Sequence, residues 1–392
     1  MRWLLDQGRW ERAVLALIAA AVAYQVFCEP IVGTADTRDY WRVMKQIGVQ
    51  YRGGIEPPVG ENIQRDFDVV PREPIAYLTS AALLGRIAVF ANSVVSKDGL
   101  FDLRMMGLVN SAAYLAALAV FLATLRRRPH WMRVAMGLAA VVVFTDVRLV
   151  AYFNSFFSES AQLIFLVATL GFALLAIDEA RPLRQRRWSY AGFFGSAILF
   201  AVAKPQDLVF CFPLAVIAFR SYPSAGPRRG AAALAAAMFL GLFAWGMLSD
   251  ANATTNWVNR RVAVLEEILP NSKTPDADLQ ELGDGDVAKA TFASIAMFYA
   301  HHPIRWWKMC KRQGRKMFTH WSLGNFPAPL KGESHALEGF NLWKDRHYPR
   351  SLWFWIAAIA SYGAVLGARW RRGGREDRSL ALFHAMWLVG CV

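Results

Sequence analysis

Gly33-Thr-Ala-Asp-Thr-Arg-Asp-Tyr-Trp-Arg-Val-Met44 is the stretch around which the chain is organised, because it directly follows the first long hydrophobic run, Ala13–Phe27. Three arginines precede that run: Arg2, Arg9 and Arg12. Basic residues favour the inner side of a membrane, and no small-residue cleavage site follows the run, so we expect a retained anchor with a cytoplasmic N-terminus. The two carboxylates of the stretch, Asp36 and Asp39, are therefore expected at the outer membrane surface.

The composition agrees with a membrane protein. The chain has 392 residues, of which 55% are hydrophobic, and the apolar residues gather in runs separated by arginine clusters. The net charge of +14 would suit nucleic acid only if it formed a basic patch on a soluble surface. Because the arginines instead mark the ends of hydrophobic runs, we expect no nucleic-acid partner. No nucleotide-binding glycine motif is present.

The hydrophobic runs predict an all-α, polytopic membrane protein, a single membrane domain over residues 1–392 with about nine spanning helices. The expected spans are 13–27, 105–125, 134–144, 161–177, 190–203, 208–219, 231–248, 352–368 and a run that begins at 380. That last run is shorter than the roughly 20 residues that a span needs, so we expect the sequence to be truncated there.

Two large outer loops, residues 29–104 and 249–350, connect these spans. In the first loop, residues 74–95 predict an amphipathic helix lying in the membrane interface. In the second, residues 259–269 predict an amphipathic helix, and Pro275–Gly283 predicts a short helix that ends at its glycine. The four cysteines match no metal pattern, and Cys28 and Cys310 are both expected outside, which leaves a disulfide between them open.

The second loop also contains two stretches that suggest binding. His301 and His302 are adjacent, so on a helix they should point to different faces, which disfavours a shared metal ion. A basic stretch beside two tryptophans, Trp306 and Trp307, predicts either a helix attracted to anionic lipid or contact with a lipid-linked phosphate. The basic residues of that stretch are Lys308, Lys311, Arg312, Arg315 and Lys316.

Asp36 and Asp39 are the candidate catalytic residues. Their spacing puts both carboxylates on one side of a helical turn. Inverting transfer of a sugar from a phosphate-activated donor needs a carboxylate that accepts the proton of the attacking hydroxyl, and a positive charge that stabilises the departing phosphate. The alternative is that Asp36 caps a short helix, as aspartate often does.

A second candidate region is Tyr152-Phe-Asn-Ser-Phe-Phe-Ser-Glu-Ser160. Polar groups at membrane depth are costly unless they face a cavity or a partner, so this stretch predicts substrate-binding residues. They are Tyr152, Asn154, Ser158 and Glu159. The alternative is an aromatic belt with Ser158 as a helix cap. Glu159 would then either orient a sugar hydroxyl or pair with Arg148 or Lys204.

The short outer turn Lys204-Pro205-Gln206 is the third candidate region. Lys204 can act as a point charge for a lipid-linked phosphate, with Gln206 beside it. The alternative is that Lys204 reaches lipid headgroups with its long side chain.

Taken together, these motifs resemble the GT-C class of membrane glycosyltransferases. More narrowly, Val32–Val43 and Tyr152–Glu159 are similar to bacterial glycan-biosynthesis hexose transferases of the WsfD type, and both the Lys204 turn and the stretch ending at Gly283 fit the same pattern. The resemblance implies a polyprenyl-phosphate-linked sugar donor, a site at the outer face, and inversion at the anomeric carbon.

The resemblance also implies residue roles. Asp36 or Asp39 would be the base, with Glu159 and Lys204 lining the site. Arg38, expected to contact substrate, stands where a small or neutral residue is usual, which either shifts the role of base from Asp39 to Asp36 or weakens the use of a metal. No residue requires a cofactor, and use of a divalent metal stays open.

We therefore expect a multi-pass glycosyltransferase of the bacterial inner membrane, with a lipid-linked sugar donor, a glycan or lipid acceptor, and membrane lipids as partners. One alternative, a transporter or flippase of lipid-linked glycans, predicts charged residues inside the spans and inverted repeats, neither of which is clear here. The other, a non-catalytic envelope assembly protein, predicts that amide substitutions at Asp36 and Asp39 are silent.

Overall fold

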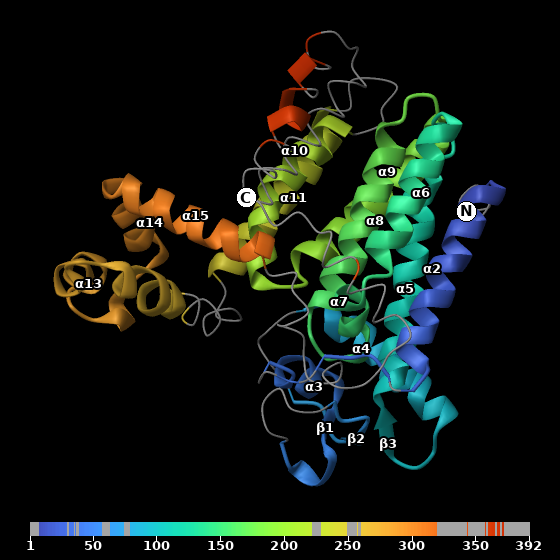
Figure 1. Ribbon diagram of the computed structural model, residues 1–392, viewed down its shortest axis with the longest axis horizontal. Coiled ribbons are helices and arrows are strands. Elements are labelled where there is room, and N and C mark those ends of the chain that lie inside the picture. The colour runs from blue at the N-terminus through green and yellow to red at the C-terminus, as the bar shows by residue number, and fades with distance from the viewer. Residues whose placement is uncertain are drawn as a thin grey trace.

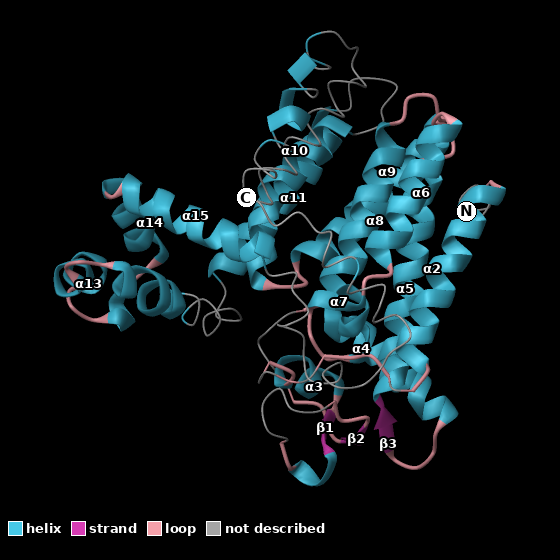
Figure 2. Cartoon of the chain, in the orientation of Figure 1, coloured by secondary structure: helices cyan, strands magenta, loops and turns pink. Residues whose placement is uncertain are grey.

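The computed structural model describes residues 8–29, 31–34, 36, 39–56, 63–73, 79–221, 229–248, 257 and 260–319, together with isolated positions between 343 and 371. Its helices form an upright bundle, with a small sheet below one end of the bundle and a group of short helices beside it (Figures 1 and 2). The spans expected at 352–368 and from 380 onward lie largely or wholly outside the described residues.

The bundle follows the hydrophobic runs. Its helices are α2 (Arg9–Phe27), α5 (Leu103–Ala123), α6 (His130–Phe144), α8 (Glu159–Ile177), α9 (Leu183–Ala201), α10 (Cys211–Ser221) and α11 (Arg229–Leu248). Over the described residues, three of these are long and apolar enough to cross a membrane: α2, α5 and α8. A fourth span results if α6 is counted together with Val147–Asn154, to which it is joined by a 53° bend.

The expectation of about nine spans is therefore not supported, although a polytopic helical membrane protein is. The physical reason lies in the lengths and compositions of the other helices. Helix α10 has 11 residues, well short of the roughly 20 that a bilayer requires, and α9 begins with three arginines in its first five residues.

A partly buried ion pair joins the starts of α2 and α6. The Arg133 Nε atom donates to Glu11 Oε1 at 2.7 Å, and its Nη2 atom donates to Oε2 at 2.8 Å. The Trp10 indole also donates to the Arg133 carbonyl at 3.1 Å. Because Glu11 is buried, this bidentate pair supplies the charge compensation that a buried carboxylate needs.

The first large loop adds a small sheet to the otherwise helical fold, which the sequence analysis did not predict. Three short antiparallel strands, β1 (Val49–Tyr51), β2 (Asp66–Val69) and β3 (Leu100–Asp102), pair in that order. Tyr51 lies opposite Phe67, and Phe67 opposite Phe101. The two phenylalanines are fully buried against the membrane bundle, which explains how strands of three or four residues are stable.

Helix α3 (Trp41–Ile47) leads from the acidic stretch into β1. It ends at Gly48, whose backbone is left-handed with φ of 79°, as a helix-terminating glycine often is. A short 3-10 turn, η1 (Arg52–Gly54), follows β1. Helix α3 and strand β1 thus lie below the bundle (Figure 1).

Helix α4 (Ser80–Val95) confirms the helix expected in this loop, from Ser80 onward; residues 74–78 lie outside the described part. Thr79 caps it by accepting from the Ala81 amide. One side of α4 is buried, and the other exposes four large apolar residues at helical spacing: Leu83, Ile87, Phe90 and Val94. This pattern suits a helix beside lipid, and its location in the membrane interface stays a prediction.

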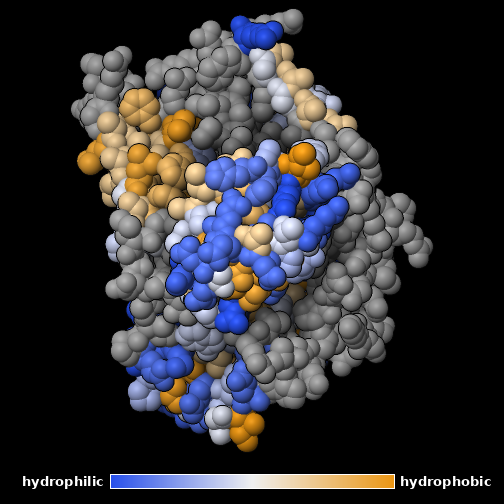
Figure 3. Space-filling view, turned by 90° about the vertical axis from the view of Figure 1, so that its left-hand side faces the viewer, coloured by the Kyte–Doolittle hydropathy of each residue, from blue (hydrophilic) through white to orange (hydrophobic). Residues whose placement is uncertain are grey.

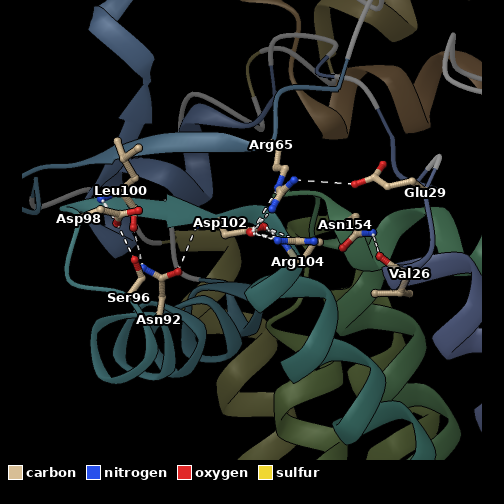
Figure 4. A network of polar contacts seen from close by, with 10 residues as sticks. All are labelled: Val26, Glu29, Arg65, Asn92, Ser96, Asp98, Leu100, Asp102, Arg104 and Asn154. Carbon is tan, nitrogen blue, oxygen red and sulfur yellow. Dashed lines mark hydrogen bonds and ion pairs between the residues drawn. The ribbon is translucent and has the colours of Figure 1, made fainter.

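A polar network ties the sheet to α4 and α5 (Figure 4). Asp102 pairs with Arg104 at 2.6 Å and with Arg65 at 3.2 Å. The Asn92 amide donates to the Leu100 carbonyl at 2.7 Å and accepts from the Asp102 amide at 3.2 Å. Charged and amide side chains thus fix the sheet at the start of α5.

The second large loop forms a group of short helices with its own small core. After a π-helical turn, η5 (Ala263–Ile268), and η6 (Leu269–Asn271) come α13 (Pro275–Gly283), η7 (Val287–Lys289), α14 (Phe292–His301) and α15 (Pro303–Thr319). The core residues are Val264, Ile268, Leu282, Ala290 and Phe298. Both predicted helices of this loop are confirmed, but the left-handed residue that ends α13 is Asp284, not Gly283.

Candidate functional site

Asp36 is a buried carboxylate held by three donors. Its Oδ1 atom accepts from the backbone amides of Asp39 at 2.9 Å and Tyr40 at 3.1 Å. Its Oδ2 atom accepts from the Tyr51 hydroxyl. The two hydrogen bonds to Oδ1 are the capping contacts that the sequence left open, because they order the turn before α3. The second contact leaves Oδ2 one further lone pair for another hydroxyl.

Tyr51 is a partner of Asp36 that sequence reasoning missed. It comes from β1, fifteen residues farther along the chain, and pairing of β1 with β2 fixes its position. Burial and the adjacent Asp36 raise the pKa of the Tyr51 hydroxyl far above its usual value. The hydroxyl therefore stays a hydrogen-bond donor to Asp36 at any physiological pH.

Asp39, the other catalytic candidate, lies in a different environment. Its side chain is 46% exposed and pairs with Arg42 at 3.1 Å. An exposed ion pair of this kind contributes little to stability and leaves the carboxylate in solvent. Arg38, predicted to contact substrate, lies outside the described residues.

Tyr40 connects the Asp36 turn to the second candidate region. The ring of Tyr40 packs edge-on against Phe156 and Phe157, with ring centroids 5.2 and 5.0 Å away. Its hydroxyl donates to the Thr34 carbonyl. Because Phe157 lies two residues before Glu159, this aromatic contact brings the Asp36 turn and the start of α8 to the same end of the bundle.

Glu159 pairs with Lys204, one of the two partners that the sequence suggested. Glu159 begins α8, and Lys204 precedes the 3-10 turn η3 (Pro205–Phe210) between α9 and α10. Both side chains are partly exposed. The Oε2 atom of Glu159 is buried and finds no donor among the described residues.

Asp207 is a further acidic residue that the sequence analysis did not single out. It is 2% exposed, and its Oδ1 atom accepts from Gln162 at 2.6 Å. Its Oδ2 atom is buried without a donor in the described part of the chain. Burial raises the pKa of Asp207 to about 7, against the opposing effects of Lys204 and Gln162. The spacings Glu159–Gln162 and Lys204–Asp207 are the signal that could have revealed this cluster, since residues three apart share a helix side.

The other predicted binding residues lie around these groups. Asn154 is fully buried, and its amide donates to the carbonyls of Val26 at 3.0 Å and Val32 at 2.8 Å. These contacts join the end of α2 to the segment before Asp36, and Figure 4 shows the contact with Val26. A substrate contact by Asn154 stays a prediction, and the structure shows it in a supporting position.

Tyr152, Ser158 and Gln206 complete the set. The Tyr152 ring packs edge-on against Phe157, with centroids 6.0 Å apart. The Ser158 hydroxyl lies 3.5 Å from that of Thr79, which links the start of α8 to the start of α4. Gln206 is exposed at the tip of its turn. Their roles toward a substrate stay predictions.

The expectation that His301 and His302 point apart is wrong. His301 Nδ1 lies 3.0 Å from one Glu281 oxygen and His302 Nε2 lies 3.1 Å from the other. The reason is that α14 ends at His301, so His302 has left the helix. Within the described residues, no group of three or more histidine, cysteine or acidic side chains could hold a metal ion. Cys28 and Cys310 are both free thiols.

The match to a known family covers most of the chain. Residues 6–284 match the family model of the YfdI N-terminal transmembrane domain. The match exceeds half of the 392 residues, so the chain belongs to this family and is a membrane protein. A search of curated proteins and a search of solved structures each found no match.

Proposed function

We propose that this protein is a membrane glycosyltransferase that moves a sugar from a polyprenyl-phosphate-linked donor to a cell-surface glycan or lipid, with inversion. The observation that carries the proposal is the buried Asp36 carboxylate, oriented by Tyr51 and two backbone amides at the end of the bundle where Lys204 and Glu159 also lie. Membership of a transmembrane family supports access to a lipid-linked donor.

Asp36 is the base in this mechanism. The acceptor hydroxyl hydrogen-bonds to Asp36 Oδ2 and attacks the anomeric carbon from the side opposite the phosphate. The new glycosidic bond forms as the bond from the anomeric carbon to the phosphate oxygen breaks. The electron pair leaves with the polyprenyl phosphate, and the proton passes to Asp36. The three donors on Asp36 fix its orientation before substrate arrives.

Lys204 supplies the positive charge for the departing phosphate. Its ammonium is paired with Glu159, and the donor phosphate takes over part of that contact. The released Glu159 carboxylate can then accept a sugar hydroxyl. We further propose that the site faces the outside of the bacterial inner membrane and that the N-terminus is cytoplasmic, in accord with the arginines that precede α2.

The test uses the full chain in lipid nanodiscs with a synthetic polyprenyl-phosphate hexose and an acceptor fraction from the host envelope. Release of polyprenyl phosphate together with a product of opposite anomeric configuration, read by NMR, is the expected result. Movement of intact lipid-linked glycan across vesicles, without cleavage of the sugar–phosphate bond, would instead identify a transporter.

A further inference from the structure

Helix α15 has two different sides, and the family match, which ends at residue 284, does not reach it. One side is occupied within the chain. Arg305 pairs with Asp278, and Arg312 donates to Glu267 at 2.9 Å and to Asn271 at 2.9 Å. Residues seven apart share a side of a helix, so these contacts attach that side of α15 to η5, η6 and α13.

The other side carries four residues at spacings of three and four, which we call the Trp–Lys face. They are Ile304, Trp307, Lys308 and Lys311. Ile304 is 70% exposed and Trp307 is 59% exposed. Both lysines are also exposed, and among the described residues neither forms an ion pair. Two cations therefore lie beside two large apolar side chains.

The contrast between the two sides indicates a partner. Arg305 and Arg312 are matched to carboxylates inside the chain, whereas the two lysines are left for something outside it. Figure 3 views the molecule from the side on which these short helices lie and shows hydrophilic and hydrophobic side chains close together there. Tryptophan favours the headgroup region of a bilayer, and lysine binds lipid phosphates there.

We propose that the Trp–Lys face of α15 binds the anionic phospholipid surface of the membrane that holds the bundle. Charge complementarity selects anionic lipid, because the face itself consists of two cations and two apolar residues and includes no carboxylate. Ile304 and Trp307 reach the boundary between headgroups and acyl chains, while Lys308 and Lys311 contact phosphates. The contact attaches α13–α15 to the membrane without any role in sugar transfer, so it stands independently of the proposed function.

Lysine acylation in nanodiscs tests the proposal. The purified full chain is placed in phosphatidylcholine alone or in an equal mixture with phosphatidylglycerol, and labelling of each lysine by a soluble acylating reagent is followed by mass spectrometry. Lys308 and Lys311 should react about fivefold more slowly in the anionic discs, the factor that corresponds to ~1 kcal/mol per lysine at such a surface. Lys273 and Lys289, exposed on the same group of helices, are internal controls whose rates should not change.

Amide hydrogen exchange of variants with reversed charges is a second measurement. Amide hydrogen exchange of residues 303–312 should be slowed by anionic lipid in the native chain and in a Lys273→Glu/Lys289→Glu control. It should not be slowed in Lys308→Glu/Lys311→Glu. Equal lysine reactivity in both lipids would overturn the proposal. So would protection that is already complete in detergent, because the face would then be covered by the chain or by a protein partner.

Discussion

Asn154→Asp removes the amide that joins α2 to the segment leading into Asp36. The native amide donates to the carbonyls of Val26 and Val32. The Val26 carbonyl lies in the last turn of α2, where carbonyls have no partner within the helix. Asn154 also packs against Gly107 of α5 so closely that a Cβ at position 107 would collide with Asn154 Oδ1.

The size of the expected destabilisation follows from the two carbonyl oxygens that lose their donor. Aspartate has nearly the same shape, so no cavity forms, but the ionised side chain donates to neither carbonyl. Each buried acceptor left unsatisfied costs about 1–3 kcal/mol, so the two lost hydrogen bonds alone lower the free energy of unfolding by roughly 2–6 kcal/mol, and burial of the unpaired charge adds to that loss. Lower pH should restore part of it, because a protonated aspartate can donate once.

The assay is loss of the monodisperse detergent-solubilised protein on heating, followed by size-exclusion chromatography. Asn110→Asp is the matched control, because Asn110 is equally buried and its amide donates to one carbonyl, that of Phe153, at 3.0 Å. Asn154→Asp should be the less stable of the two variants. Native stability combined with lost activity would refute this reasoning and assign Asn154 to substrate binding instead.

Other predictions concern buried charges. The pKa of Asp207 is raised from 3.8 to about 7, so between these values the folded state binds a proton that the unfolded state has lost, and native stability should fall as pH rises from about 4 to about 7. Asp207→Asn should abolish that pH dependence in thermal unfolding. An unchanged pH dependence would exclude Asp207 as its source. Glu11→Ala removes the hydrogen-bonded partner of Arg133, whose side chain is 23% exposed, and should cost about 1–3 kcal/mol, whereas the exposed pair variant Glu73→Ala should cost less than about 1 kcal/mol. Equal melting temperatures of those two variants would contradict that comparison.

The helices were predictable because hydrophobic runs are local signals. The run at 13–27 corresponds to α2, and that at 161–177 to α8. The number of spans was less predictable, because a hydrophobic run can form a helix that is too short to cross a bilayer, as α10 with its 11 residues does. The sheet could not be predicted, because β1 and β3 have three residues each and are stabilised by burial of Phe67 and Phe101 instead of a repeating pattern.

In the candidate site, too, contacts within a short stretch were predictable and contacts between distant segments were not. Asp36 was found from its place after the first run, and its capping contacts lie within four residues. Its contact with Tyr51 depends on strand pairing, which no spacing in the sequence reveals. The pair of Glu159 and Lys204 was one of two options, and only the folded chain, which brings the residue before η3 to the start of α8, selects it over Arg148.

Complementation with an Asp36 variant tests the central claim most directly. Cells lacking the protein receive the native chain, Asp36→Asn or the control Asp39→Asn, at equal expression, and their envelope glycans are compared. Asparagine keeps an oxygen for the Asp39 and Tyr40 amides, so the turn should remain folded. We predict that the native chain restores a missing sugar and that Asp36→Asn does not. Restoration by Asp36→Asn would contradict Asp36 as the base.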